Sequence, residues 1–336
     1  MFIGITLLTS FLLSLLFTPF VKGIALRYRI LDVSNTTLKT HTINTPYLGG
    51  ISIFISVLIT SVFMILLYKM MISLVLIGLL IACFMIIATG LTDDMYNLRP
   101  LTKISFQIIA ASLAWLIGIR IHLTGLEQLD IIVTILWIVG LSNAFNLIDI
   151  MDGLSSGVAA ISSIFLAIIC LELGEIMSAL LFLSIAGACF GFLIFNFNPA
   201  QIFMGDTGSL FLGFLIACST TTMFQYQANS QVVVPVIILG IPIFETIFIS
   251  FLRIKSGIPP WQGTKDHFAL RLVKLGYSVK RTVISTYLFG ILLGSISLMF
   301  FYSGSPALYS FLLITILLTV IGWLLSNVDI SESQHS

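Results

Sequence analysis

The sequence predicts an all-α polytopic membrane protein of about eleven transmembrane helices, with its N-terminus outside and its C-terminus in the cytoplasm. Of the 336 residues, 58% are hydrophobic and only 9% are charged, whereas a soluble domain carries roughly 25% charged residues. Because so few polar side chains could cover a water-exposed surface, lipid is the expected solvent. The N-terminal apolar run lacks a basic region and a cleavage site, so we expect a first span and not a signal peptide.

Eleven runs are long and apolar enough to cross a bilayer, which needs about 20 mostly apolar residues. They are residues 2–20, 48–68, 72–91, 102–120, 130–147, 156–172, 176–195, 208–226, 232–252, 282–302 and 307–326. The run 130–147 is the weakest because polar residues begin inside it. No polar stretch between the runs could bury a core of its own, so residues 1–326 are predicted to form one transmembrane domain and 327–336 a cytoplasmic tail.

Lys and Arg residues fix the predicted orientation. With eleven spans, the loops on one side of the membrane hold 13 of the 15 Lys and Arg residues, and the opposite side holds only Lys69 and Arg120. Cytoplasmic loops of membrane proteins carry the excess of positive charge, so the basic loops are predicted to be cytoplasmic. The loops on the other side are short, and any chemistry is therefore expected at the cytoplasmic face.

Composition and motifs exclude several other classes of site. The net charge is +1 and no Lys/Arg run suggests nucleic-acid binding. No P-loop, GxSxG nucleophile motif or HExxH zinc motif is present. No two cysteines form a CxxC pair, and all lie in apolar runs, which predicts buried free thiols. They are Cys83, Cys170, Cys189 and Cys218.

Five aspartates at the cytoplasmic ends of predicted spans give the main functional signal. A carboxylate at membrane depth costs roughly 2.5–3.5 kcal/mol on insertion scales, so it rarely persists without a task. The five come from three separate loops: Asp93 and Asp94, Asp149 and Asp152, and Asp206. Adjacent side chains on a helix diverge by about 100°. Asp93 and Asp94 are therefore expected to have unequal roles, one facing a metal and the other orienting a lysine or accepting a proton.

The segment NAFNLIDIMDGL spaces four polar residues three apart, so that each neighbouring pair shares a helix face. The four are Asn143, Asn146, Asp149 and Asp152. Gly153 would permit a helix break that lets the row converge. The alternative is that these residues only cap a helix end. In FNFNPAQIFMGDTGSL, Asp206 opens a span whose free N–H groups favour a phosphate, with plain N-capping by Asp206, Thr207 and Ser209 as the alternative.

The chemical type of these groups indicates the metal. They are hard oxygen donors without a Cys/His cluster beside them, which suits Mg²⁺ held by one or two carboxylates and substrate phosphates. The polar loop 253–281 adds cations that are fit to bind a diphosphate, although positive-inside topology alone could explain them. These are Arg253, Lys255, Lys265, His267 and Arg271.

Taken together, these segments resemble the polyprenyl-phosphate N-acetylhexosamine-1-phosphate transferases, a glycosyltransferase family 4-like group, in the branch that uses UDP-GlcNAc. The resemblance covers about residues 19–281 and rests on KTHTINTPYLGGI, GLTDDMYNLRPLTK, NAFNLIDIMDGL, FNFNPAQIFMGDTGSLFLG and PIFETIFISFLRIKSG followed by DHFALRL. It implies transfer of HexNAc-1-phosphate, and first of all GlcNAc-1-phosphate, from a UDP-sugar to undecaprenyl phosphate with release of UMP. This would be the first membrane step of cell-wall or surface-polysaccharide synthesis.

Two alternatives stay open beside this function. One is a phospho-MurNAc-pentapeptide transferase of peptidoglycan synthesis. The other, from a different class, is an ion-coupled transporter or lipid flippase, in which intramembrane acids would bind ions or protons. Transporters place such acids near the midplane, often within inverted repeats, whereas here the acids gather at one face. The resemblance further implies a multi-pass protein of the plasma membrane with UDP-HexNAc and polyprenyl phosphate as partners, no nucleic acid, and a homodimer left open.

The resemblance also implies roles for individual residues. Asp93 and Asp94 would handle the lipid phosphate, and Asp149 and Asp152 would complete the catalytic set at the nucleotide and metal. Asp206 would be the main Mg²⁺ ligand with Asp152 beside it, and Mn²⁺ could substitute. The implied substrate-binding residues are Lys39, Lys103, Asn143, Asn146, Asn196, Phe203, His267 and Arg271, with Asn196 and Phe203 at the uracil.

The chain departs from the family pattern in the polar loop 253–281, the fifth loop of that pattern. That loop usually carries two or three histidines followed by an arginine, but here only His267 and Arg271 remain, with Ala269 and Leu270 in the histidine places. We therefore expect His267 and Arg271 to carry its polar contact with the diphosphate or sugar. The missing histidines argue against the MurNAc-pentapeptide branch. Asn97 also stands where many members have a third acid.

Overall fold

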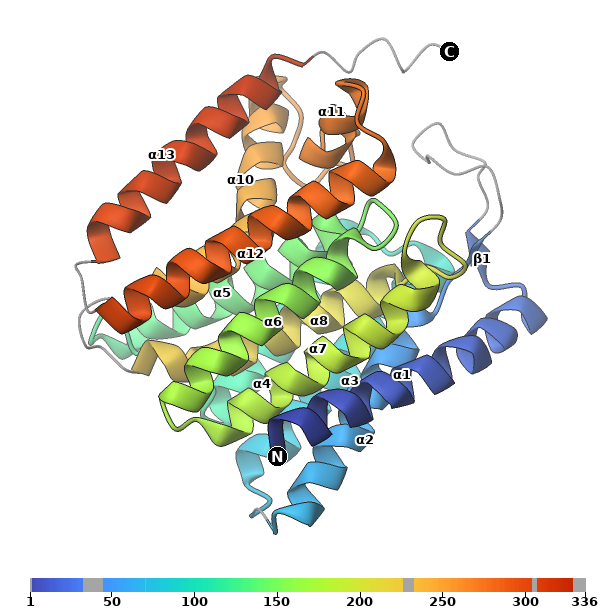
Figure 1. Cartoon of the computed structure of the whole chain (residues 1–336), viewed down its shortest axis with the longest axis vertical. Coiled ribbons are helices and arrows are strands. Elements are labelled where there is room, and N and C mark those ends of the chain that lie inside the picture. The colour runs from blue at the N-terminus through green and yellow to red at the C-terminus, as the bar shows by residue number, and fades with distance from the viewer. Residues whose placement is uncertain (1, 33–44, 70, 226–232, 304–306, 329–336) are drawn as a thin grey trace.

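The computed structural model describes residues 2–32, 45–69, 71–225, 233–303 and 307–328 (Figure 1). The helices are α1 Phe2–Arg27, α2 Gly49–Leu67, α3 Leu74–Tyr96, α4 Pro100–Leu116, α5 Glu127–Ile148, α6 Leu154–Glu172, α7 Ile176–Asn196, α8 Gly205–Thr220, α9 Val233–Ile238, α10 Gly240–Lys255, α11 Phe268–Lys274, α12 Val279–Ser303 and α13 Ala307–Ser326. A 3₁₀ turn, Thr221–Gln225, follows α8. The strands β1 (Leu31–Asp32) and β2 (Thr45–Pro46) pair antiparallel, with Asp32 opposite Thr45.

Every predicted span coincides with helical structure, which confirms the all-α polytopic class. Eight helices are long and apolar enough to cross a membrane by length and composition, and α4 and residues 311–326 of α13 are shorter apolar helices. The count of eleven spans and the orientation stay predictions. The weakest predicted run, 130–147, lies within α5.

One predicted span is interrupted in the structure. The run 232–252 is divided into α9 and α10 on either side of Leu239. Pro242 has no N–H group to donate to the carbonyl four residues earlier, which belongs to Ile238. The Ser162 hydroxyl of α6 donates to that carbonyl instead, at 3.3 Å. The break is therefore stabilised by a neighbouring helix.

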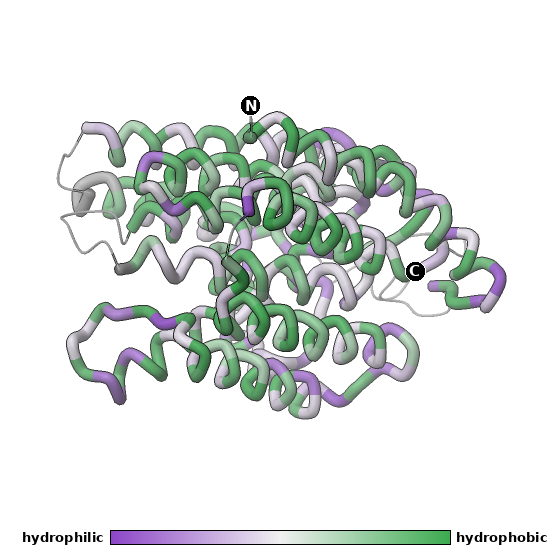
Figure 2. Tube along the Cα trace, turned by 90° about the horizontal axis from the view of Figure 1, so that it is seen from below, coloured by the Kyte–Doolittle hydropathy of each residue, from purple (hydrophilic) through white to green (hydrophobic). Residues whose placement is uncertain are grey.

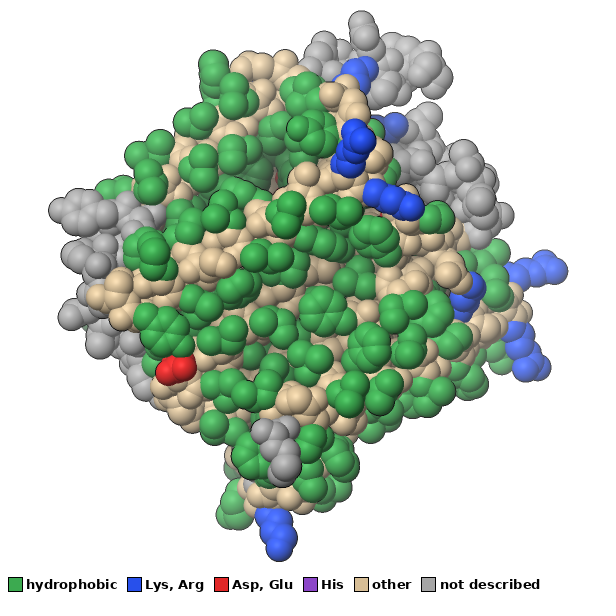
Figure 3. All heavy atoms as spheres, in the orientation of Figure 1, with side chains coloured by type: hydrophobic (Ala, Val, Ile, Leu, Met, Phe, Trp, Pro, Cys, Tyr) green, Lys and Arg blue, Asp and Glu red, His purple; other side chains and the backbone are tan. Residues whose placement is uncertain are grey.

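The long helices lie side by side, and α10, α12 and α13 gather on the side away from α1 and α2 (Figure 1). The short elements β1 and α11 lie toward the same end of the bundle. Hydrophobic residues run along the helices, while many hydrophilic residues lie in the turns at their ends (Figure 2). The face in Figure 3 is mostly apolar, and most of its Lys and Arg side chains lie along one edge. This pattern is the one expected of a bundle that lipid surrounds.

Helix α8 forms the centre of the bundle. All of its residues are buried except Asp206, and it packs against α2, α3 and α5. A helix that is apolar around its whole circumference is expected in such a position. Because Asp206 stands in its first turn, the central helix presents a single accessible carboxylate at one end of the bundle.

Glycines bring the first turn of α8 against its neighbours. A Cβ on Gly50 of α2 would overlap the backbone N and Cα of Gly208, and a Cβ on Gly90 of α3 would lie 2.6 Å from the Thr207 nitrogen. Real side chains do not fit at such distances, so backbone meets backbone, as small residues permit between membrane helices. Two further contacts lock the junction: Gly49 N–H donates to the Phe203 carbonyl and Gly50 N–H to the Met204 carbonyl, each at 2.9 Å.

This junction makes a prediction about stability. We expect Gly50→Ala to lower the melting temperature of the detergent-purified protein, because the new methyl group displaces α8 from α2. Gly140→Ala is the matched control: Gly140 lies in α5 with open space where its Cβ would be, and alanine favours a helix by roughly 0.5–1 kcal/mol over glycine. Equal melting temperatures for the two variants would contradict the close contact.

Candidate active site

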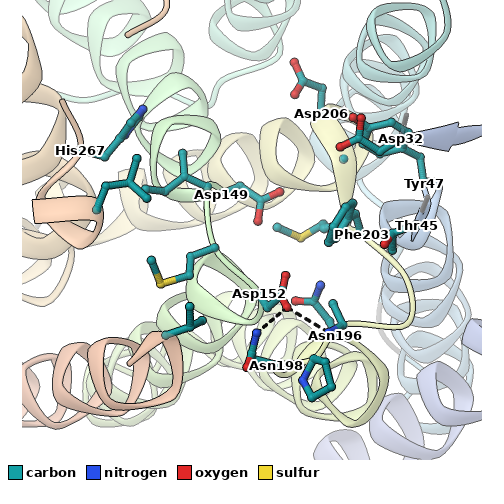
Figure 4. Close-up of a pocket in the computed structure, with 18 of the residues that line it drawn as sticks. Asp32, Thr45, Tyr47, Asp149, Asp152, Asn196, Asn198, Phe203, Asp206 and His267 are labelled. Atoms are coloured by element: carbon teal, nitrogen blue, oxygen red, sulfur yellow. Dashed lines mark hydrogen bonds between the residues drawn. The ribbon is translucent and has the colours of Figure 1, made fainter. Parts of the chain in front are cut away.

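A cavity of about 720 Å³ opens at the end of the bundle where α8 begins. Four segments line it: the β1–β2 hairpin, the turn between α5 and α6, the segment between α7 and α8, and residues 263–279. Figure 4 shows Asp32 and Tyr47 across the cavity from Asp149 and His267. The polar lining residues are Asp32, Thr45, Tyr47, Asp149, Asp152, Asn196, Asn198, Asp206, Thr264, Lys265 and His267.

Asp206 belongs to a network that continues behind the cavity. Its carboxylate accepts a hydrogen bond from Asn146 Nδ2 at 2.8 Å and contacts the Lys103 ammonium. Lys103 also donates to Asp93 Oδ2 at 2.9 Å and to Asn146 Oδ1 at 3.3 Å. Lys103 thus compensates two carboxylates at once. The structure thus brings together Asp93, Lys103, Asn146 and Asp206, which come from four helices.

Asp94 caps the central helix. Its Oδ1 accepts the backbone N–H of Asp206 at 2.8 Å, and its Oδ2 accepts the N–H of Thr207 at 3.1 Å and the Thr207 hydroxyl at 2.6 Å. Gly205, with φ +72°, starts the helix, and a Cβ there would lie 2.7 Å from Asp94 Oδ2. The carboxylate therefore takes the place that the sequence suggested for a substrate phosphate or for capping by Asp206 itself.

Asp93 and Asp94 have different partners, as their adjacency predicts. Asp93 faces Lys103 and also accepts the Leu98 N–H at 2.7 Å, which closes the turn between α3 and α4. Asn97 ends α3 in the left-handed conformation with φ 50°. Asparagine tolerates that conformation better than most residues. The backbone conformation therefore explains why an amide suits this position.

The turn between α5 and α6 carries two of the predicted acids. Helix α5 ends at Ile148, and Gly153, with φ +78°, permits α6 to begin. Asp152 Oδ2 accepts hydrogen bonds from Asn198 Nδ2 at 2.9 Å and from the Ala200 N–H at 3.0 Å. The Asp149 carboxylate accepts no hydrogen bond from any described residue. Burial, with Asp94 and Asp152 nearby, raises the pKa of Asp149 to about 8.

Two predicted binding residues have internal partners. Asn143 lies outside the cavity lining and exchanges hydrogen bonds with Gln107, donating to Gln107 Oε1 at 2.5 Å. Its predicted contact with substrate is therefore corrected to a contact between α5 and α4. Asn196 lines the cavity, but its amide bonds to the Gly153 N–H, the Ser156 hydroxyl and the Ile202 carbonyl. Those bonds hold the cavity wall in shape.

The hairpin supplies lining residues for which the sequence motifs predicted no role. Asp32 is 5% exposed and faces the cavity with Thr45 and Tyr47. Burial, with Asp94 and Asp149 nearby, raises the pKa of Tyr47 to about 12, so its hydroxyl stays a hydrogen-bond donor. Its ring lies 6.2 Å from the ring of Phe203, which also lines the cavity. Thr45 and Tyr47 lie inside the KTHTINTPYLGGI motif, and this position is the feature of the sequence that could have indicated their place in the site.

The predicted pair His267 and Arg271 is separated by the structure. His267 lines the cavity, and its Nδ1 lies 2.8 Å from Glu245 Oε1 on α10. Arg271 lies outside the lining and is 5% exposed. Its guanidinium donates to the Leu325 carbonyl at 3.0 Å and the Val328 carbonyl at 2.6 Å, and to Asp266 Oδ1 at 3.0 Å.

The prediction that Arg271 binds the diphosphate is therefore corrected. Its donors are taken by Asp266 and by the carbonyls of Leu325, Ser326 and Val328, at and just after the end of α13. The last carbonyls of a helix have no partners within the helix itself. A cation is also favoured at the C-terminal end of a helix by the macrodipole. Lys39, another predicted binding residue, lies outside the described residues.

The donor set of the cavity fits a magnesium ion that substrate helps to hold. Asp206 has a side chain 28% exposed and shares the cavity with Asp32, Asp149 and Asp152. No group of three or more His, Cys, Asp or Glu side chains in the described part of the chain could hold a metal by itself. Mg²⁺ is usually bound by one or two carboxylates with phosphates and water, so this sparse set of oxygen donors suits it.

Comparisons with known proteins show what the chain is similar to. The model of the family described as glycosyl transferase family 4 matches residues 76–224. A probable undecaprenyl-phosphate N-acetylglucosaminyl 1-phosphate transferase of Bacillus subtilis is 34% identical, over 86% of this chain and 82% of its own. A decaprenyl-phosphate N-acetylglucosaminephosphotransferase of Mycolicibacterium smegmatis is 30% identical, over 90% and 83%. A phospho-N-acetylmuramoyl-pentapeptide-transferase of Bacillus cereus is 31% identical, over 86% and 94%.

The contacts of Arg271 predict a structural phenotype. Arg271→Ala removes charge-assisted hydrogen bonds that contribute about 1.5–3 kcal/mol each, so we expect a lower melting temperature and faster amide exchange at residues 325–328. Arg271→Lys keeps the positive charge but lacks the planar guanidinium fork, so its melting temperature should lie between those of the wild type and Arg271→Ala. A wild-type melting temperature for Arg271→Ala, together with a tenfold higher KM for a UDP-sugar, would restore the diphosphate role.

The pKa of Asp149 predicts how stability depends on pH. The folded protein retains this proton up to pH about 8, whereas an unfolded aspartate releases it near pH about 4. The group thus stabilises the fold at low pH, and this contribution is lost as pH rises from about 4 through about 8. Asp149→Asn cannot titrate. Melting temperatures of both proteins from pH 5 to 9 should show the wild type losing stability relative to the variant until about pH 8; a pH-independent difference would contradict the shifted pKa.

Proposed function

The chain belongs to glycosyl transferase family 4, and we propose that it transfers an N-acetylhexosamine-1-phosphate from a UDP-sugar to undecaprenyl phosphate. GlcNAc-1-phosphate is the proposed group, because relatives that cover most of the chain carry that activity in their names. The observation that carries the proposal is the acid-lined cavity at one end of an apolar bundle, with Asp206 at the tip of the central helix. We place this end at the cytoplasmic face, where UDP-sugars are found and where the basic loops lie.

The proposed reaction is a phosphoryl transfer. An oxygen of the lipid phosphate attacks the β-phosphorus of the UDP-sugar, a new P–O bond forms, and the bond between that phosphorus and the bridging oxygen breaks. The bridging oxygen leaves with UMP, and the product is an undecaprenyl diphosphate-sugar. Catalysis of such a transfer rests on positioning and on neutralising phosphate charge.

The residues present would serve those two needs in different ways. A magnesium ion, held by Asp206 with Asp152, would neutralise charge on the diphosphate, and Mn²⁺ could take its place. Asp149 carries a proton below pH about 8, so it can donate a hydrogen bond to a phosphate oxygen where a carboxylate would repel it. Asp93 orients Lys103 beside Asp206. Asp94 acts through the backbone of α8 and is a positioning residue.

An assay with defined substrates tests the proposal. Purified protein with undecaprenyl phosphate should release UMP from UDP-GlcNAc in preference to UDP-MurNAc-pentapeptide, and EDTA should stop the release. Asp206→Asn should lower kcat by roughly 10²-fold or more, as loss of a charge-stabilising group does. Glu172→Gln is the control, because Glu172 ends α6 away from the cavity and bonds to Tyr302.

Each result has a clear reading. UMP release only from UDP-MurNAc-pentapeptide would identify the alternative donor. No UMP release from any UDP-sugar would overturn the proposed function, and full activity in EDTA would overturn the role of magnesium alone. Equal effects of Asp206→Asn and Glu172→Gln would remove Asp206 from the site.

A further inference from the structure

A buried carboxylate stands apart from the aspartates of the cavity. Glu245 lies on α10 and is 0% exposed. Removing an ionised carboxylate from water is costly unless it is paired and hydrogen-bonded. No role followed for this residue from the sequence, although it lies in the PIFETIF block. Its contacts therefore indicate why an acid is retained at this depth.

Glu245 bonds to the start of α11. Its Oε1 lies 2.8 Å from His267 Nδ1, and its Oε2 accepts the Phe268 N–H at 3.3 Å. Both carboxylate oxygens are thus used on two consecutive residues. Arg253 of α10 interacts with Glu245 only through space, because its own donors bond to Thr264 Oγ1 and the Pro260 carbonyl. The imidazole is therefore the direct partner of the carboxylate.

This contact decides what His267 offers to the cavity. A carboxylate on Nδ1 accepts the ring N–H and fixes the orientation of the ring. Nε2 is then the ring nitrogen left for a ligand, and no described residue bonds to it. When the ring carries the positive charge that balances Glu245, Nε2 is an N–H donor. Among the described lining residues, only Lys265 and His267 can supply positive charge, against four aspartates.

Arg271, four residues after His267, fixes the other end of this segment. Arg271 bonds to Asp266, which precedes His267, and to the last carbonyls of α13. His267 thus lies between two anchors, one on α10 and one on α13. Where the family pattern has further histidines, Ala269 is fully buried and Leu270 lines the cavity. A single histidine therefore has to be placed accurately.

We propose that Glu245 is a positioning residue that holds His267 so that its Nε2–H donates to a phosphate oxygen of the nucleotide-sugar. This inference rests on the proposed function, because it takes a UDP-sugar as the ligand. It assigns to α10 a part in donor binding and none in binding of the lipid acceptor.

A double-mutant cycle tests the proposal. Glu245→Gln keeps the size of the side chain but removes its charge, and His267→Asn removes the ring. Each should raise KM for UDP-GlcNAc about tenfold, the effect of losing one charge-assisted hydrogen bond, while KM for undecaprenyl phosphate stays unchanged. If Glu245 acts through His267, the double variant is no worse than His267→Asn alone. Thr246→Val is the matched control, because the Thr246 hydroxyl bonds only to the Pro242 carbonyl.

Additive effects, or an equal rise in KM for both substrates, would overturn the proposal and leave Glu245 with a role in folding alone. If Glu245→Gln does not fold, Glu245→Asp takes its place in the cycle. Failure of the proposed function is recognised separately, by the absence of UMP release from the wild type. The cycle is then read from the rise in melting temperature that UDP-GlcNAc produces: loss of that rise in both single variants supports the inference, and its absence in the wild type overturns it.

Discussion

The hydrogen bonds from the first turn of α8 to Asp94 hold the site in place. The central helix is buried along its whole length except at Asp206, so whatever fixes its first turn also fixes that carboxylate. Asp94 takes two backbone N–H groups and a hydroxyl, and the glycine contacts with α2 and α3 leave no room for the helix to shift. A carboxylate at a helix start is favoured by the macrodipole. Asp94 caps the N-terminus of α8 although it belongs to α3.

Charge balance is the second constraint. Four aspartates line one cavity, and an anionic substrate would add to their repulsion unless each acid were compensated. Lys103 compensates Asp93 and Asp206, and Asp152 accepts two N–H donors. Asp149, which lacks such a donor among the described residues, keeps its proton instead. The three solutions differ because each acid meets different neighbours, although all are aspartates at the same end of the bundle.

The opposite wall of the cavity depends on the membrane helices in another way. Residues 266–271 follow a polar loop, yet two membrane helices hold them. Glu245 of α10 contacts His267, and the end of α13 accepts hydrogen bonds from Arg271. The position of His267 is therefore set by helices that lipid surrounds. A change in the packing of α10 or α13 would reach the cavity through these contacts, whereas the hairpin wall with Asp32 and Tyr47 rests on α2 and the segment before α8.

The sequence by itself determined the membrane class, the helical segments and the gathering of Asp93, Asp94, Asp149, Asp152 and Asp206 at one end, because apolar length and charge placement are properties of single segments. It also carried the family motifs. Only the tertiary structure decided which polar side chain meets which partner: Asp94 the start of α8, Glu245 the imidazole of His267, Arg271 the end of α13, and Asn143 the amide of Gln107. The physical reason is that the partners in each pair lie on different elements, far apart in the sequence, and meet only when the chain folds. Whether their side chains point toward each other also depends on where each helix ends.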